Sequence, residues 1–201
     1  MEHMGEITIE QIVSADGYAM DAAGGIDFFD DVDFGDQTRT DTEQMRWLAG
    51  VDAILFGRRT YELFAAYWPQ TEPSEDAVAA PIDRLPKFVV SRTLDRAPWG
   101  DGEIEILRDG PVDAVRSLKT QYRSIAIWGS LQLTDALFRA GEVDILRLRI
   151  VPMLLGSGRP VAPPQTGRSP LELVASHRDA SGVVTDEYRV GRTPRRVGAT
   201  T

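Results

Sequence analysis

The chain has 201 residues, no cysteine, and 22 lysines and arginines against 31 aspartates and glutamates, a formal net charge of −9. This length suits one domain, the missing cysteines exclude disulfides and thiol nucleophiles, and the acidic balance argues against binding of nucleic acid, which needs clustered Lys and Arg. No apolar run approaches the roughly 20 residues that span a bilayer, and the N-terminus lacks a secretory signal, so we expect a cytoplasmic protein without a membrane partner.

Strand and helix patterns alternate along most of the chain. Short apolar runs predict strands at residues 6–13, 51–56, 87–90, 104–107, 124–128 and 143–151. Amphipathic stretches predict helices at residues 40–49, 58–68, 111–118 and 131–140. Two further strands, at 171–178 and 183–190, form a predicted hairpin. The pattern predicts a three-layer α/β/α domain over residues 1–190, with a mixed, mostly parallel sheet, and a disordered tail at 191–201.

Two of the predicted helices begin at capping signals. Thr40-Asp41-Thr42-Glu43 is a capping box, and Ser130 stands where its hydroxyl would cap the helix after it, which Gly141 ends. The acidic segment 21–41 precedes the first helix. Counted from Asp31, a calcium loop would need Glu at the twelfth place, which is Thr42. The segment is therefore predicted to be a solvated loop.

Several nucleotide-binding and catalytic motifs are missing from the chain. There is no G-x-x-x-x-G-K-[ST] and no G-x-G-x-x-G, and Gly156-Ser157-Gly158 lacks the spacing of a nucleophile elbow. The two histidines, His3 and His177, are too few for a histidine-rich metal site, and a lone strand histidine is more often structural than catalytic. We therefore expect neither a metal nor a Ser-His-Asp triad.

Three strand ends instead carry groups that suit phosphate. Gly57-Arg58-Arg59-Thr60 and Gly129-Ser130-Leu131 each place a glycine between a strand and a helix, so that free N–H groups and the positive end of a helix dipole point at one spot. Ser91-Arg92 follows a third strand. Ordinary turn chemistry would explain any one of these glycines. Three such ends in order favour a ligand with several phosphates at the carboxyl ends of the strands.

These residues also carry a family resemblance, in order over roughly residues 6–190. The matching segments are Ser14–Ala19, Leu55–Glu62, Lys87–Leu94, Trp128–Ser130 and Val143–Pro160. With them, the chain resembles the dihydrofolate reductase superfamily, and most of all the reductase domain of bifunctional riboflavin-biosynthesis deaminase-reductases. It lacks their zinc-binding deaminase half, so we expect no deamination. Gly129-Ser130 stands where true dihydrofolate reductases have a Gly-Gly pair.

The resemblance implies the dihydrofolate reductase fold and NADPH as the hydride donor. By position, Gly57, Arg58, Arg59 and Thr60 would hold the pyrophosphate and adenosine side, Ser91 and Arg92 the 2′-phosphate, and Gly129, Ser130 and Leu131 the second helix N-terminus. The loop 16–25 would lie near the nicotinamide and cover the substrate. Its site residues would be Asp16, Gly17 and Ala19, together with Ser14 just before it. A homodimer is also implied, and the apolar strand 143–151 would serve it unless that strand is core.

The function expected from this resemblance is NADPH-dependent reduction of a pterin-like or ribosylaminopyrimidine-type small molecule. One alternative is a true dihydrofolate reductase, which would use Asp41, sixteen residues before Gly57, as its catalytic carboxylate. Asp41 would otherwise only stabilise a helix N-terminus. The other alternative is a nucleotide-binding protein that kept the fold without turnover.

Overall fold

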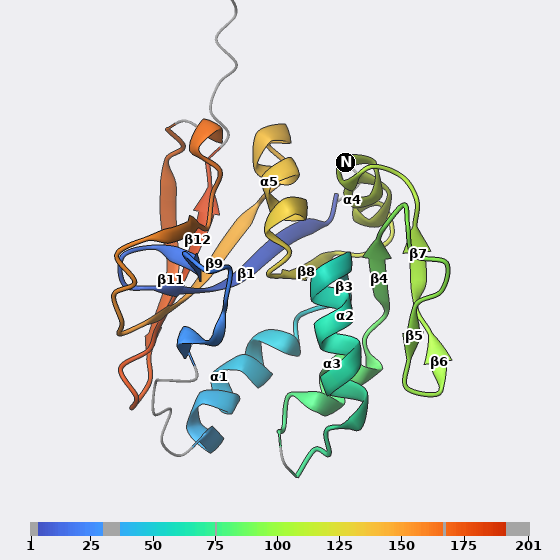
Figure 1. Ribbon diagram of the computed structural model, residues 1–201, viewed down its shortest axis with the longest axis horizontal. Coiled ribbons are helices and arrows are strands. Elements are labelled where there is room, and N and C mark those ends of the chain that lie inside the picture. Colours follow the sequence, from blue (N-terminus) through green and yellow to red (C-terminus); the bar gives the residue numbers. More distant parts are fainter. Residues whose placement is uncertain (1–3, 30–36, 75, 167, 192–201) are drawn as a thin grey trace, which may run out of the picture.

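An eight-stranded sheet forms the middle of the molecule (Figure 1). The computed structural model describes residues 4–29, 37–74, 76–166 and 168–191, without the side chains of 37–41 and 165. In spatial order the strands are β11 (Leu171–Arg178), β12 (Val184–Val190), β9 (Ile145–Val151), β1 (Glu6–Ser14), β8 (Ser124–Trp128), β3 (Ala53–Gly57), β4 (Lys87–Val90) and β7 (Glu105–Leu107). The six strands from β9 to β7 in this order run parallel to one another. Strand β12 is antiparallel to β9, and β11 is antiparallel to β12. The predicted mixed sheet and its closing hairpin are confirmed.

Helices cover both faces of this sheet, because alternate strand residues are apolar on both sides. Ile54 and Phe56 of β3 pack in one cluster with residues of α1 (Gln37–Leu48), α2 (Arg58–Tyr67) and α3 (Ala79–Arg84). Their neighbours Ala53 and Leu55 pack in a second cluster with α4 (Pro111–Lys119) and α5 (Leu131–Ala140). The predicted three layers are therefore present. No helix in the described ranges is long and apolar enough to cross a membrane.

Several short elements were not predicted, since segments of two to six residues show no clear periodicity. Strand β2 (Tyr18–Asp21) pairs with β10 (Gly158–Pro160), and β5 (Pro98–Trp99) pairs with β6 (Gly102–Glu103). Helix α3 was also missed. Single 3₁₀ turns occur at Asp27–Phe29, Trp68–Gln70 and Pro164–Thr166.

The predicted capping box is wrong, because α1 begins at Gln37, three residues before Thr40. Asp41 is thus the fifth residue of the helix rather than part of its first turn. The carboxylate of Glu43, which a capping box would direct to the backbone, contacts the guanidinium of Arg147 instead. Glu43 therefore pairs with a buried cation from another strand, and α1 begins earlier than the sequence suggested.

The predicted side-chain cap at Ser130 is also wrong. Ser130 precedes α5 in the left-handed conformation (φ 58°), and its hydroxyl makes no capping hydrogen bond. That hydroxyl accepts a hydrogen bond from the backbone N–H of Gly57 instead (2.8 Å). The other end of α5 is as predicted, with Gly141 in the left-handed region at φ 69°.

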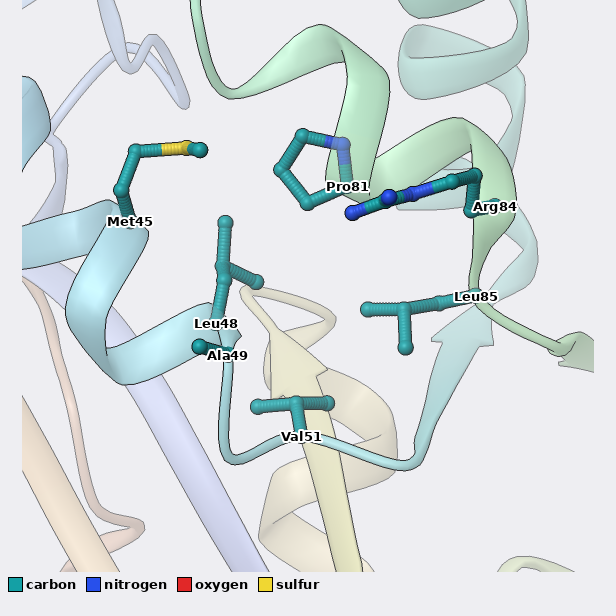
Figure 2. Close-up of a pocket in the computed structure, with 7 residues that line it drawn as sticks. All are labelled: Met45, Leu48, Ala49, Val51, Pro81, Arg84 and Leu85. Carbon is teal, nitrogen blue, oxygen red and sulfur yellow. The ribbon is translucent and has the colours of Figure 1, made fainter.

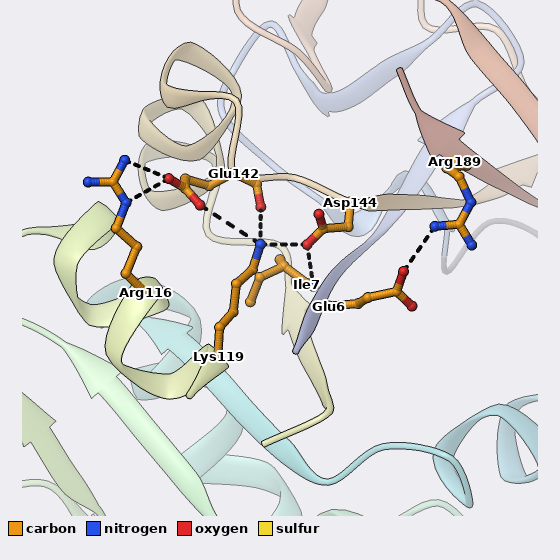
Figure 3. A network of polar contacts seen from close by, with 7 residues as sticks. All are labelled: Glu6, Ile7, Arg116, Lys119, Glu142, Asp144 and Arg189. Atoms are coloured by element: carbon orange, nitrogen blue, oxygen red, sulfur yellow. Dashed lines mark hydrogen bonds and ion pairs between the residues drawn. The ribbon is translucent and has the colours of Figure 1, made fainter. Parts of the chain in front are cut away.

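The amino ends of the strands are held by a polar network (Figure 3). The buried Lys119 of α4 donates to Asp144 (2.6 Å) and to the carbonyl of Glu142 (3.1 Å). Asp144 accepts a hydrogen bond from the N–H of Ile7 (2.9 Å), and Arg116 pairs with Glu142 at 2.8 Å. These contacts link α4 to the starts of β1 and β9. They lie at the opposite end of the sheet from the carboxyl ends of the parallel strands.

Strand β9 lies inside the sheet. It pairs with β1 on one side and β12 on the other, and Leu146 and Val151 are buried. The apolar strand that was expected to serve a homodimer is therefore core, and its Arg147 is buried beneath α1. A homodimer remains a prediction.

Candidate functional site

The carboxyl ends of β3 and β8 form a topological switch point in the sheet. The two strands are neighbours and parallel. Strand β3 leads into α2 on one face, whereas β8 leads into α5 on the opposite face. In open α/β sheets, ligands bind at such a point, outside the carboxyl ends of the strands. The two glycine turns identified in the sequence lie at this point.

These two turns touch each other through Gly57 and Ser130. The N–H of Gly57 donates to the Ser130 hydroxyl, and a Cβ atom added to Gly57 would lie 3.1 Å from Ser130 Cβ and Oγ. Gly129 has φ 51°, and a Cβ atom there would lie 3.5 Å from Thr60 Oγ1 on α2. Close packing against Ser130 thus favours glycine at position 57, whereas the left-handed φ favours glycine at position 129. The start of α2 and the start of α5 are held side by side.

The end of β4 joins the same edge through Arg58 and Thr93. Arg58 donates from Nη1 to Thr93 Oγ1 (2.7 Å) and from Nε to Glu62 (2.7 Å). The buried hydroxyl of Ser91 accepts hydrogen bonds from the N–H groups of Thr93 (3.2 Å) and Leu94 (3.1 Å). Ser91 thus shapes its own turn. The side chains of Arg59 and Arg92 are exposed on either side.

Leu131 opens α5 but is a core residue. Its side chain is buried against Val13 and Ala19. Its carbonyl accepts a hydrogen bond from Arg159 (3.2 Å), so Leu131 offers a ligand only its backbone N–H. Ala19 is equally buried and belongs to β2, which leaves a shorter loop after β1 than the sequence suggested.

The turn after β1 is fixed by the carboxylate of Asp16. Asp16 accepts hydrogen bonds from the Ser14 hydroxyl (2.6 Å) and from the N–H groups of Gly156 (2.7 Å) and Leu155 (3.1 Å). The Ser14 contact, with the two backbone contacts, holds the pKa of Asp16 below its ordinary value of 3.8. Gly17 takes a left-handed φ of 86° in the same turn. The segments after β1 and β9 are therefore joined.

A buried ionic cluster, which we call the Arg147 cage, lies one residue below the Gly129 turn. The row across the sheet is Trp128, Glu10, Arg147 and Glu187, and α1 adds Glu43, Gln44 and Trp47. The guanidinium of Arg147 is fully buried, at 2.9 Å from Glu10 and 3.3 Å from Glu187, and it also contacts Glu43. Glu10 accepts hydrogen bonds from the Trp128 indole (2.7 Å) and Gln44 (2.9 Å).

The sequence analysis missed the Arg147 cage. Arg147 and Arg149 alternate with apolar residues in β9, a pattern that usually marks a solvated face. The sequence does not show the order of the strands in the sheet. That order places β9 between β12 and β1, and α1 packs over it. Glu10 in the first predicted strand was the available signal, because a carboxylate on a buried strand needs a cationic or hydrogen-bonding partner.

Comparison with known proteins identifies the family. The family model described as "RibD C-terminal domain" matches residues 6–185. The chain belongs to the RibD C-terminal domain family. It is 29% identical over 186 residues to the Bacillus subtilis (strain 168) protein YyaP, covering 90% of this chain and 93% of YyaP.

Two solved structures show that this RibD C-terminal domain has the dihydrofolate reductase fold. A pyrimidine reductase-like protein from Corynebacterium diphtheriae is 19% identical, with a TM-score of 0.64, and the match covers 94% of this chain and 93% of that one. Dihydrofolate reductase from Enterococcus faecalis, solved with NADP(H), is 12% identical with a TM-score of 0.59, covering 96% and 100%. The resemblance and the fold class expected from the sequence are confirmed.

The candidate catalytic residue Asp41 is placed only by its backbone. It lies in α1, two residues before Glu43, whose side chain reaches the Arg147 cage. The side chain of Asp41 lies outside the described residues, as do Asp30–Asp36 of the acidic segment. A catalytic role for Asp41 remains a prediction.

An open cavity of about 270 Å³ lies between α1 and α3 (Figure 2). Met45, Leu48, Pro81 and Arg84 are among its lining residues, and Val51 forms its base just before β3 begins. The cavity is thus at the amino ends of the strands, opposite to the glycine turns. It takes no part in the candidate site.

Replacing Glu187 with Gln should make the free energy of unfolding less dependent on pH. Burial raises the pKa of Glu187 above its ordinary value of 4.5, with Glu43 and Glu10 adding to this and Arg147 opposing it. A raised folded-state pKa means that the stability contributed by protonated Glu187 is present below the unfolded pKa and is lost as pH rises through the folded pKa. The variant should therefore gain stability relative to the wild type between about pH 4 and about pH 8.

Urea unfolding of both proteins at the two pH values measures this gain. The exposed Glu105→Gln serves as the matched control. A stability difference between Glu187→Gln and wild type that stays constant, or shrinks as pH rises, would contradict the assignment.

Proposed function

We propose that this protein is an NADPH-dependent reductase of a pterin-like or ribosylaminopyrimidine-type small molecule. The observation that carries this proposal is the meeting of two glycine turns, at Gly57 and Gly129, at the switch point of the sheet. Membership of the RibD C-terminal domain family supports it. So does the structural likeness to a dihydrofolate reductase solved with NADP(H).

The residues at this edge fit a dinucleotide with several phosphates. The first N–H groups of α2 and α5 have no partner within their helices, and the cradle between Gly129 and Thr60 is one that a Cβ atom would narrow. Arg58 and Arg59 lie at the start of α2 and would neutralise the pyrophosphate. The hydroxyl of Ser91 and the exposed Arg92 would hold the 2′-phosphate.

NADPH, when bound, supplies a hydride. The protein's own part is to position and to exclude water, since hydride transfer needs no protein nucleophile. The joined turns at Asp16 and Gly156 hold the segment after β1 against the segment after β9, on the edge where the substrate would lie. Reacting atoms need a separation of about 3–3.5 Å, and a rigid edge of this kind can maintain it.

Turnover separates this proposal from its two alternatives. NADPH absorbance should fall when a ribosylaminopyrimidine is added, and we expect dihydrofolate to be a poor substrate. Fast oxidation of NADPH in the presence of dihydrofolate would instead support a true dihydrofolate reductase, provided that the Asp41→Asn variant lacks this activity. Saturable NADPH binding without oxidation by either compound would support the non-catalytic nucleotide-binding alternative.

Arg92→Ala should weaken NADPH binding by about 10–100-fold and leave NADH binding nearly unchanged, because one charge-assisted contact to the 2′-phosphate is lost. Fluorescence titration with both nucleotides measures the ratio. Arg178→Ala, which replaces an exposed arginine of β11 at the opposite edge of the sheet, is the matched control. Equal losses of affinity for NADPH and NADH would contradict the assignment of the 2′-phosphate to Arg92.

A further inference from the structure

Two arginines of β9, Arg147 and Arg149, share one face of the sheet but have opposite surroundings. Arg147 is fully buried and held by the carboxylates of the Arg147 cage. Arg149 is partly buried, in register with Ile12 on β1 and Thr185 on β12, neither of which carries charge. The side chain of Arg149 forms no hydrogen bond and no ion pair with any of the residues that the structure describes.

The surroundings of Arg149 are apolar on the side toward the carboxyl ends of the strands. Ile12 packs against a buried cluster of Phe28, Val151 and Val183. The other side of Arg149 is the Arg147 cage, two residues back along β9, or about 7 Å. A guanidinium in such a position has lost part of its hydration without gaining an anion from the residues that the structure describes, which is unfavourable unless a ligand supplies one.

The position of Arg149 also borders the candidate cofactor edge. Strand β1 pairs with β8 only as far as Glu10, but it pairs with β9 as far as Ser14. Beyond Glu10, the edge of β1 that faced β8 therefore has no strand partner within the described ranges, because β8 ends at Trp128 and the chain turns at Gly129. Ile12 lies on this stretch, with Arg149 as its neighbour across the sheet.

We propose that Arg149 binds an anionic group of the substrate, a carboxylate or a phosphate, while Arg147 is structural. The identification of the bound molecule as a substrate rests on the proposed function. The planar guanidinium offers two parallel N–H donors to such a group, and Lys cannot reproduce that geometry. The apolar residues beside it would contact the uncharged body of the same molecule. The enzyme is thereby specific for an anionic small molecule.

The test is anion binding by the full chain, read from tryptophan fluorescence. Trp128 bonds Glu10 in the adjacent row of the sheet and Trp47 lies 4.8 Å from the Arg147 guanidinium, so both report on this face. Ribose 5-phosphate is titrated against ribose, and benzoate against benzyl alcohol, which separates a phosphate from a carboxylate ligand. The variants are Arg149→Gln and Arg149→Lys, with the exposed Arg178→Gln of β11 as control.

We expect at least one of the two anions to bind wild type and Arg178→Gln saturably at roughly 10 mM or below, with the neutral partner not binding. Arg149→Gln should bind that anion about 10–100-fold more weakly, and Arg149→Lys should recover part of the loss. Equal affinity in Arg149→Gln, or no saturable binding of either anion by wild type, would overturn the proposal.

A parallel NADPH titration keeps the two proposals apart. Arg149→Gln should bind NADPH like the wild type, and a loss of NADPH affinity in this variant would place Arg149 in the cofactor site and overturn the inference. If wild type fails to bind NADPH, the proposed function fails, whereas the anion titrations still decide the role of Arg149.

Discussion

Arg147→Met should lower the free energy of unfolding by about 3–5 kcal/mol, because it leaves Glu10, Glu43 and Glu187 without their shared cation. The guanidinium is fully buried, so water cannot replace it. Urea unfolding at neutral pH measures the loss.

Two control variants distinguish the contribution of the Arg147 cage to stability from that of an exposed ion pair. Arg116→Met breaks an exposed pair with Glu142 and should cost at most about 1 kcal/mol. Adding Glu10→Gln to Arg147→Met removes the most deeply buried carboxylate and should restore part of the stability. A loss below about 1 kcal/mol for Arg147→Met would show that the cage is not structural.

Gly57→Val should abolish cofactor binding while the fold survives. A Cβ atom at Gly57 would already lie 3.1 Å from Ser130, so the larger valine would push the starts of α2 and α5 apart. The N–H groups of the two turns would then no longer converge on one phosphate-binding position. Loss of two charge-assisted hydrogen bonds, about 3 kcal/mol together, weakens NADPH binding about 100-fold or more. Titration of the variant with NADPH measures the loss, and far-UV circular dichroism monitors the fold.

Gly110→Val is the matched control for this variant. Gly110 precedes α4 with nearly the same backbone angles as Gly57 before α2, but a Cβ atom there meets nothing within 4 Å. Its NADPH affinity should equal that of the wild type. Unchanged affinity in a folded Gly57→Val protein would contradict the role of the turn.

The fold was largely predictable because its strands are short apolar runs with glycine or proline at their ends. The run at 124–128, for example, is β8 to the residue, and the resemblance set its place in a known fold. The glycine turns were found for the same reason, since a glycine between a strand and a helix is a local signal.

What could not be predicted depends on contacts between distant residues. The hydroxyl of Ser130 binds Gly57, 73 residues away, instead of its own helix. Glu43 binds Arg147, 104 residues away, and the capping box that its local sequence suggests does not form. Arg149, whose side chain has no partner among the described residues, was equally hidden, because arginines that alternate with apolar residues are typical of a solvated strand face.

Titration of the wild-type chain with NADPH tests most directly the claim that the carboxyl edge of this sheet is a nucleotide site. The account predicts saturable binding of one NADPH per chain in roughly the micromolar range, with NADH weaker. No saturable binding of NADPH up to about 1 mM, with the protein folded, would contradict it.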